Sequence, residues 1–184
     1  MDGALNKIER DYWNNRYARG STSGDGSYGE KLEEKLRWLS GITEIDSISE
    51  YGCGDFNFGK RLVEMFKPKK YTGMDVSSII IERNQEAYPE HEWLPVGDLP
   101  QADLVLCVDV LFHVSNEDEV EKILQQLERA WVRYLVITAY EREQTEKLSP
   151  HVYIRPFDPA RFGTPLVRKE TMGDENLYFY IFSR

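Results

Sequence analysis

The sequence predicts an α/β fold, a mostly parallel sheet with helices on both faces and an antiparallel hairpin at its C-terminal edge. Strand-like and helix-like patterns alternate from residue 46 onwards, which is typical of parallel strands joined by helical crossovers. The run DLVLCVD at 103–109 is apolar on both faces, as a central parallel strand should be. Only four residues separate the last two strand-like runs, 165–171 and 176–183, so we expect these runs to pair antiparallel.

Apolar residues at helical spacing predict the helices. Leu32, Leu36 and Leu39 stand at i, i+4 and i+7 in the helix expected before the first strand. Pro68 ends a later helix, because proline cannot continue the helical hydrogen bonds. Ser115 is expected as the N-cap of the last helix. The predicted helices span residues 4–18, 29–40, 58–66, 78–88 and 116–130.

Five short runs bounded by turn residues predict the parallel strands that precede the hairpin. They span residues 47–51, 71–75, 91–96, 103–109 and 134–138. The segment 140–163 is polar, and we expect it to form a long loop between the fifth strand and the hairpin. With the hairpin, the sheet is predicted to have seven strands.

The composition indicates a single acidic domain. With 184 residues and a formal charge of −9, the chain should repel the phosphate backbone of nucleic acids. No apolar stretch resembles a signal peptide or approaches the roughly 20 residues that a bilayer requires, so no membrane association is expected. Cys53 and Cys107 lie far apart, and we expect reduced thiols in a cytoplasmic protein. The histidines and cysteines lack metal-ligand spacing, so no metal site is predicted.

The stretch SEYGCGDFNFG at 49–59 predicts a ligand-binding turn between a strand and a helix. Gly52 and Gly54 let the backbone turn sharply and approach a ligand closely. A dinucleotide loop would need a third glycine at position 57, where Asn57 stands instead. Glu50 and Asp55 further disfavour a pyrophosphate at this helix N-terminus. We therefore expect a ligand with a positive or neutral face rather than NAD.

Acidic residues also follow the next three strands. Asp75 ends the second strand, where a carboxylate could accept both hydroxyls of a ribose. Asp98 follows the third strand, where it could accept from an adenine amino group. Asp109 ends the fourth strand and could face an ammonium group. For any single one, a helix cap or a solvated loop acid is an equal alternative, but the set favours a nucleoside site.

The motifs EYGCGDFNFG, YTGMDVS, VGDLP and ADLVLCVDVLFHV resemble, in order and spacing, those of class I S-adenosylmethionine-dependent methyltransferases. The resemblance covers roughly residues 45–140. It implies a Rossmann-like class I methyltransferase fold with S-adenosylmethionine (SAM) as cofactor and S-adenosylhomocysteine (SAH) as product. One departure is Phe56, since many members have glycine there. Phe56 is expected either to pack under the helix start or to narrow the site beside the cofactor.

The resemblance also implies which residues bind the cofactor. Glu50, Gly52 and Gly54 would face its methionine part, Asp75 its ribose and Asp98 its adenine. The segment YWNNRYARG at 12–20 resembles one that closes over the cofactor in these enzymes. Across these motifs, the residues expected in the cofactor site are Trp13, Tyr17, Glu50, Gly52, Cys53, Gly54, Asp75, Val76, Asp98, Leu99, Asp109 and Val110.

Three further features concern the methyl acceptor. His113, four residues past Asp109, is the candidate general base for a hydroxyl acceptor, and its alternative role is a backbone hydrogen bond. His151, Tyr153 and Arg155 alternate in the long loop and could line an acceptor pocket. Arg155 suits a carboxylate or phosphate, or it pairs with one of the many acids.

These features divide the single domain into three parts. Residues 1–44 form a helical cap whose Gly/Ser run at 20–29 acts as a lid. Residues 45–140 form the cofactor-binding core, and residues 141–184 contain the substrate loop and the terminal hairpin. With no separate substrate domain, the acceptor site must be roofed by the N-terminal cap and the long loop.

We expect a methyltransferase that acts on a small molecule or glycan, with a hydroxyl oxygen as the candidate attacking atom. One alternative is an RNA or protein methyltransferase, which predicts a basic surface near residues 150–170. A second is a SAM-binding protein without catalysis, and a third is an NAD-dependent oxidoreductase. The (N/D)-P-P-Y signature of DNA amino-methylation is absent after the fourth strand, where DVLF stands.

Overall fold

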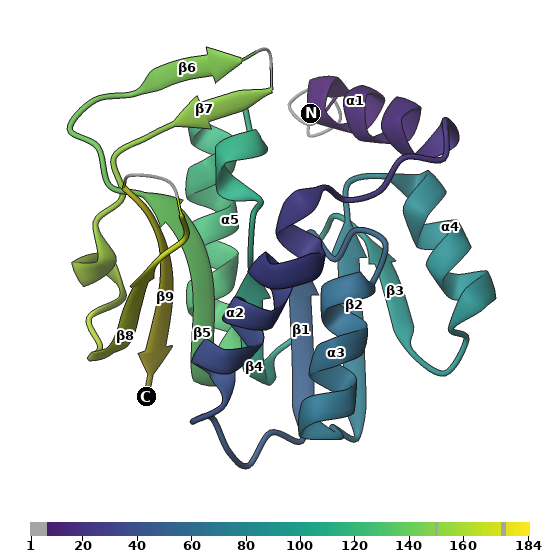
Figure 1. Cartoon of the computed structure of the whole chain (residues 1–184), viewed down its shortest axis with the longest axis horizontal. Coiled ribbons are helices and arrows are strands. Elements are labelled where there is room, and N and C mark those ends of the chain that lie inside the picture. The colour runs from purple at the N-terminus through teal and green to yellow at the C-terminus, as the bar shows by residue number, and fades with distance from the viewer. Residues whose placement is uncertain (1–6, 150, 174–175) are drawn as a thin grey trace.

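The computed structural model describes residues 7–149, 151–173 and 176–184, which form one seven-stranded sheet and a small two-stranded sheet (Figure 1). The order in the large sheet is β3-β2-β1-β4-β5-β9-β8. Strands β1 to β5 are parallel, whereas β9 is antiparallel to both β5 and β8. The strands are β1 (Ser47–Tyr51), β2 (Lys70–Asp75), β3 (Glu92–Pro95), β4 (Ala102–Cys107), β5 (Trp131–Tyr140), β8 (Leu166–Thr171) and β9 (Leu177–Ser183). The predicted sheet with its antiparallel edge hairpin is confirmed.

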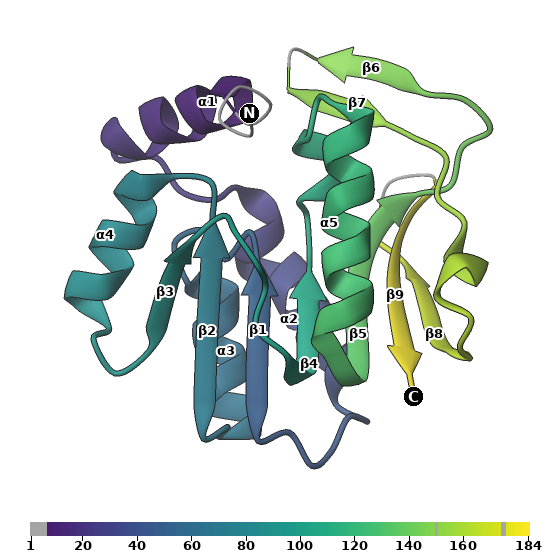
Figure 2. The ribbon, with the colours of Figure 1, turned by 180° about the vertical axis from the view of Figure 1, so that it is seen from behind.

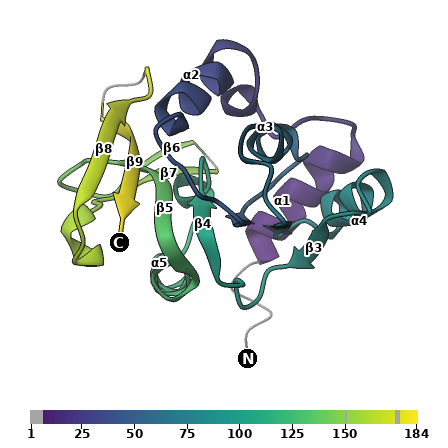
Figure 3. The same cartoon turned by 90° about the horizontal axis from the view of Figure 1, so that it is seen from below.

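Helices cover both faces of the sheet, as predicted. Helices α2 and α3 lie on one face and α5 lies on the other (Figure 3). Leu36 and Leu62 belong to the core on the α2–α3 side, and Ile123 and Leu127 to the core under α5. Helix α1 packs against α4 beyond the carboxyl ends of the strands (Figure 2). The helices are α1 (Lys7–Ala18), α2 (Gly29–Leu39), α3 (Asn57–Phe66), α4 (Ser78–Ala87) and α5 (Glu117–Ala130). Residues 4–6 of the first predicted helix lie outside the described residues.

The start of α5 differs from the prediction. Asn116, rather than Ser115, caps the helix, and its side-chain oxygen accepts from the backbone N–H of Glu119 at 3.1 Å. Ser115 instead donates its backbone N–H (2.7 Å) and its hydroxyl to Glu9 Oε1 on α1. The predicted cap is wrong because Ser115 forms its hydrogen bonds with Glu9, which lies 106 residues earlier in the chain.

The segment 140–163 is more regular than the predicted loop. It contains the hairpin β6 (Glu146–Ser149) and β7 (Val152–Ile154), followed by the short helix η3 (Pro159–Phe162). Ile154 is 1% exposed and packs with Tyr140 and Leu177, so one face of β7 is buried. The hairpin lies above the carboxyl end of the large sheet (Figure 1). Strand β5 is also longer than predicted, because β9 pairs with it as far as Tyr140.

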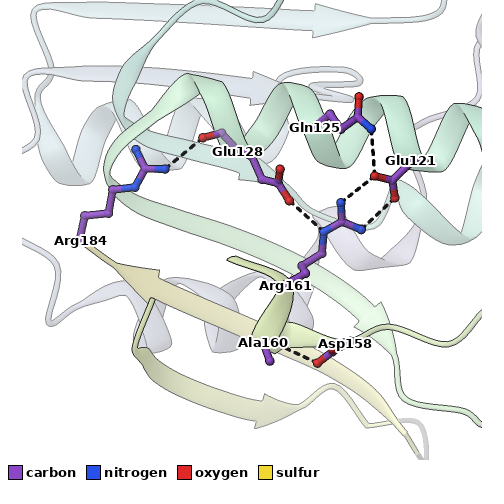
Figure 4. Close-up of polar contacts among 7 residues, drawn as sticks. All are labelled: Glu121, Gln125, Glu128, Asp158, Ala160, Arg161 and Arg184. Carbon is purple, nitrogen blue, oxygen red and sulfur yellow. Dashed lines mark hydrogen bonds and ion pairs between the residues drawn. The ribbon is translucent and has the colours of Figure 1, made fainter. Parts of the chain in front are cut away.

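One arginine fixes the end of this segment to α5 (Figure 4). Arg161 donates from Nη1 and Nη2 to the two carboxylate oxygens of Glu121 and from Nε to Glu128, each at 3.0 Å. The Asp158 carboxylate caps η3 by accepting from the Ala160 N–H at 2.9 Å. The chain between β7 and η3 is thereby held close to α5. None of the helices in the described residues is long and apolar enough to cross a membrane.

Candidate active site

A partly open pocket, which we call the glycine-loop cavity, lies beyond the carboxyl ends of β1, β2 and β4. It encloses about 690 Å³ of empty space when the solvent at its mouth is included. Its walls come from α1, the 20–29 segment, the loop after β1 and the short helix η2 (Leu111–His113). An open parallel sheet is expected to bind ligands at this edge. Most of the residues predicted for the site line this cavity, namely Trp13, Tyr17, Gly52, Gly54, Asp75, Val76, Asp109, Val110 and His113.

The two glycines of the loop are required by its geometry. Gly52 has φ +78°, and a Cβ atom there would lie 2.2 Å from Val110 Cγ2. Gly54 has φ +51°, and a Cβ atom would lie 2.1 Å from Ser23 Oγ. Both the left-handed backbone and the close neighbours exclude a side chain. The loop therefore presents bare backbone to the cavity.

Asp75 is 7% exposed and holds the loop in place. Its two carboxylate oxygens accept from the backbone N–H groups of Gly54 (3.0 Å) and Ser77 (2.9 Å). Burial raises the pKa of Asp75 to about 6, although these backbone donors favour the ionised form. Each oxygen keeps further lone-pair capacity, so the carboxylate can accept from a ligand hydroxyl as well.

Glu50 and Cys53 do not line the cavity, although both were predicted for the cofactor site. Glu50 is 3% exposed and accepts a hydrogen bond from the Tyr71 hydroxyl beneath the loop. Burial raises the pKa of Glu50 to about 8, so the side chain is mostly protonated at neutral pH. Cys53 is also buried, with its sulfur turned toward Gly73 on β2.

Phe56 packs under the start of α3, which decides between the two predicted positions. The ring is 1% exposed and contacts the rings of Tyr71, Tyr88 and Trp93 at centroid distances of 4.8 to 4.9 Å. Its backbone is left-handed (φ +62°), an unfavourable conformation for a residue with a side chain. Burial of the aromatic ring offsets that strain, and the residue supports the loop from below.

Asp109 lies in the cavity wall with a partner that the sequence did not reveal. The ammonium group of Lys35, 1% exposed on α2, donates to the Asp109 carboxylate and, at 2.8 Å, to the carbonyl of Gly26. Asp109 was expected to face an ammonium group of the ligand, and in the structure its carboxylate is paired with Lys35. The sequence signal for a buried Lys35 was its position three residues after Leu32, on the buried stripe of α2.

The 20–29 segment closes over the glycine loop. Ser23 Oγ accepts from the Asp55 N–H at 2.9 Å and lies 3.1 Å from the Tyr17 hydroxyl. In return, the Ser23 N–H donates to the Asp55 carboxylate at 3.1 Å. Farther along, Asn57 donates to the carbonyl of Ser27. Ser23 and Ser27 line the cavity, and sequence reasoning missed both because nothing distinguished them within a Gly/Ser run.

Helix α1 contributes Trp13 and Tyr17, as predicted, and also Glu9. The Trp13 and Tyr17 rings stack at 5.8 Å. Glu9 is 8% exposed, and its Oε2 has no hydrogen-bond partner among the described residues. An unpaired carboxylate oxygen inside a cavity suits a ligand that carries N–H or O–H donors. Nothing in the sequence distinguished Glu9 from the other charged residues of α1.

His113 lines the cavity beside Trp13, with ring centroids 5.3 Å apart. Its Nδ1 lies 2.8 Å from the carbonyl oxygen of His151, and because a carbonyl only accepts, Nδ1 carries the proton. The neutral ring then has a lone pair at Nε2. Burial is the main cause that lowers the pKa of His113 below its ordinary value, so the neutral form dominates at pH 7.

The remaining predicted residues lie elsewhere. Asp98 is exposed and borders a surface depression with Val76 and Glu119, whereas Leu99 is part of the core under α5. His151 lies in the turn after β6, where its ring stacks on Tyr12 at 4.6 Å. The structure therefore does not place His151 on one side with Tyr153 and Arg155.

Tyr153 and Arg155 line a second, partly open pocket, which encloses about 340 Å³ of empty space when the solvent at its mouth is included. We call it the arginine cavity. It lies between β7, the end of β5, α5 and η2. Leu111 and Phe112 of η2 border it, while His113 of the same turn faces the glycine-loop cavity. A single helical turn thus separates the two cavities.

Comparisons with known proteins agree with this architecture. Residues 49–132 match the family model described as a methyltransferase domain. No curated protein sequence matches the chain. A SAM-bound magnesium protoporphyrin IX methyltransferase from Synechocystis PCC 6803 superposes with a TM-score of 0.65 at 20% identity, over 99% of this chain and 98% of that one. The fold is thus that of a class I methyltransferase.

Two other solved structures match over the whole chain. A structure described as a DhpI–SAM–HEP complex has a TM-score of 0.64 at 14% identity, covering 100% of this chain and 99% of that chain. The N-methyltransferase NodS from Bradyrhizobium japonicum WM9, with SAH bound, has a TM-score of 0.61 at 15% identity and the same coverage. Together with the match of residues 49–132 to the methyltransferase-domain model, the predicted enzyme class, a methyltransferase, is confirmed.

Proposed function

We propose that this methyltransferase binds SAM in the glycine-loop cavity and transfers its methyl group to a hydroxyl of a small molecule or glycan. The observation that carries the proposal is the meeting of Asp75, the bare glycine loop and His113 in one cavity. SAM or SAH is named in the descriptions of the similar structures given above.

The residues present fit this cofactor. The bare backbone at Gly52 and Gly54 admits a ligand close to the loop, and Asp75 retains capacity to accept ribose hydroxyls. The unpaired Oε2 of Glu9 would accept from an amino group. Lys35 neutralises Asp109, but the carboxylates of Glu9 and Asp75 also border the cavity, which favours a cationic sulfonium ligand over the pyrophosphate of NAD.

When bound, SAM supplies an electrophilic methyl group, so the protein must mainly orient the acceptor and remove a proton from it. His113 lines the cavity, and its Nε2 lone pair would take the proton from an acceptor hydroxyl. The His151 carbonyl keeps this tautomer fixed. The 20–29 segment and α1 exclude water above the loop.

The basic residues near the hairpin do not favour an RNA or protein acceptor. Arg161 pairs with Glu121 and Glu128, Arg168 with Glu170, and Lys169 with Glu141. Their charge is therefore largely neutralised within the chain, and a phosphate backbone would find little free positive potential there.

Calorimetric titration with SAH tests the proposal. Wild type should bind in the micromolar range, and Asp75→Asn should bind at least about tenfold more weakly, because charge-assisted hydrogen bonds contribute about 1.5–3 kcal/mol. The control is Asp46→Asn, the same exchange at an exposed residue that pairs with Lys69 below the opposite end of the sheet. Absence of SAH binding by wild type would refute the proposed function. Binding without methyl transfer to any acceptor would favour the non-catalytic alternative.

A further inference from the structure

Arg155 is the unusual residue of the arginine cavity. Its Nε and Nη1 atoms are buried, and neither has a hydrogen-bond partner among the described residues. Within that part of the chain, no other arginine has buried side-chain nitrogens without partners. Leaving a buried charged donor unpaired is costly, so such a group usually has a ligand.

The rest of the cavity is mostly apolar and aromatic. Phe112, Val120, Tyr140 and Phe157 contribute to its walls, and the Phe112 and Tyr140 rings meet edge to face at 5.6 Å. The Arg155 guanidinium lies over the Tyr153 ring, with 5.3 Å between Cζ and the ring centroid. The ring helps to hold the flat cation in one orientation. A small apolar body with one anionic group would match both the walls and the arginine.

The charge around Arg155 limits the anion. Burial lowers the pKa of Arg155, and the carboxylates of Glu117 and Glu9 oppose this shift only in part. No ion pair joins Arg155 to either acid within the described residues. One guanidinium neutralises one negative charge, so a dianionic phosphate would leave excess negative charge near Glu117 and Glu9. A carboxylate carries one negative charge, which the guanidinium neutralises fully.

We propose that the arginine cavity is the acceptor subsite and that it binds a small apolar or aromatic molecule through a carboxylate held by Arg155. This inference rests on the proposed function and narrows its acceptor to an apolar carboxylate rather than a glycan. Phe112 borders the subsite and His113, the next residue, borders the glycine-loop cavity. An acceptor anchored at Arg155 and reaching past η2 would bring its hydroxyl to His113.

The contrast with Arg161 supplies a matched control. Arg161 lies six residues later in the same segment, and all three of its guanidinium nitrogens donate to Glu121 or Glu128 (Figure 4). Arg161 is thus satisfied within the chain and serves to fix η3 to α5. Removing it should lower thermal stability without affecting recognition of a carboxylate.

The test compares 2-naphthoate with its neutral isostere 2-naphthamide by calorimetry in the presence of SAH. Wild type should bind the carboxylate at least tenfold more tightly than the amide. Arg155→Met should abolish this preference, Arg155→Lys should keep part of it, and Arg161→Met should retain it fully. Circular dichroism and the SAH affinity of each variant establish that the fold and the cofactor site persist.

Two outcomes would overturn the inference while leaving the proposed function intact. In the first, wild type binds SAH but shows no preference for the carboxylate, or binds neither naphthalene compound at millimolar concentration. In the second, 2-naphthyl phosphate binds more tightly than 2-naphthoate, so that the anion is of another class. Failure of SAH binding would instead refute the proposed function itself.

Discussion

The two cavities on either side of η2 differ in how they are built. The glycine-loop cavity is formed largely by residues at strand ends, such as Gly52 after β1 and Asp75 at the end of β2. The arginine cavity is formed by side chains that meet from a small hairpin, α5, β5 and η2. The first contains several acids with assigned hydrogen bonds, whereas the second contains one unpaired cation among apolar walls. The glycine-loop cavity is therefore fixed largely by local motifs and the arginine cavity by long-range packing.

The largest expected effect concerns the floor of the glycine loop. Phe56→Ala should lower the free energy of unfolding by about 3–5 kcal/mol, because a fully buried ring leaves a cavity. Phe56→Gly should be less destabilising than Phe56→Ala by about 1 kcal/mol, since glycine accepts the left-handed backbone. Chemical denaturation measures both values.

The matched change in the arginine cavity is Phe157→Ala. This ring is only partly buried, so the loss of free energy of unfolding should be well below that of Phe56→Ala. Equal losses of the free energy of unfolding at the two positions would contradict the difference in burial between the two rings.

The next effect concerns the turn between the cavities. His113→Gln should reduce kcat about 100-fold, the lower range for a general base, with SAH affinity within threefold of wild type. In wild type, kcat/KM should fall as the pH drops through the lowered pKa of His113, because a protonated ring cannot accept a proton. A variant with unchanged kcat would assign His113 a purely structural role through its bond to the His151 carbonyl.

Glu50, which lies beneath the glycine loop, should make the free energy of unfolding depend on pH. The folded-state pKa of about 8 lies above the ordinary value of 4.5, so the stabilisation is complete below pH 4.5 and is lost as the pH rises to 8. The free energy of unfolding should therefore fall between pH 5 and 8. Glu50→Gln should show a fall smaller by about 3–4 kcal/mol. Parallel pH profiles of the two proteins would contradict a buried, protonated Glu50.

The smallest expected effect concerns the 20–29 segment. Ser23→Ala removes the acceptor of the Asp55 N–H, a contribution of about 1 kcal/mol, and should weaken SAH binding about fivefold. SAH should also slow proteolysis within this segment in wild type. The neighbouring exposed Ser21→Ala serves as a control. If SAH left the cleavage rate unchanged, the segment would not act as a lid.

The sequence predicted features that depend on local pattern, and the structure differs where distant segments meet. Alternating strand and helix patterns were sufficient to predict a mostly parallel sheet, and Gly52, Gly54 and Asp75 were found from their spacing. The burial of Glu50 under Tyr71 could not be predicted, because it depends on β1 pairing with β2. Lys35 was missed for the same reason, since its partner Asp109 lies 74 residues away.

The hairpin β6–β7 shows the same limit. The polar sequence of its segment predicted a loop. One face of β7 is buried because Ile154 packs against Tyr140 and Leu177, which are distant or outside the segment's own pattern. Among the described residues, Arg155 Nε and Nη1 lack hydrogen-bond partners, a property of the assembled cavity that has no signature in the sequence.

The most direct test of the central claim is the affinity for SAH as a function of pH. Asp75 must be ionised to accept the ribose hydroxyls, and burial raises its pKa to about 6. SAH should therefore bind wild type about tenfold more weakly at pH 5 than at pH 7. Binding to Asp75→Asn should be weak and nearly independent of pH. A wild-type affinity that is constant across this range, or equal to that of Asp75→Asn, would contradict a SAM site built on Asp75.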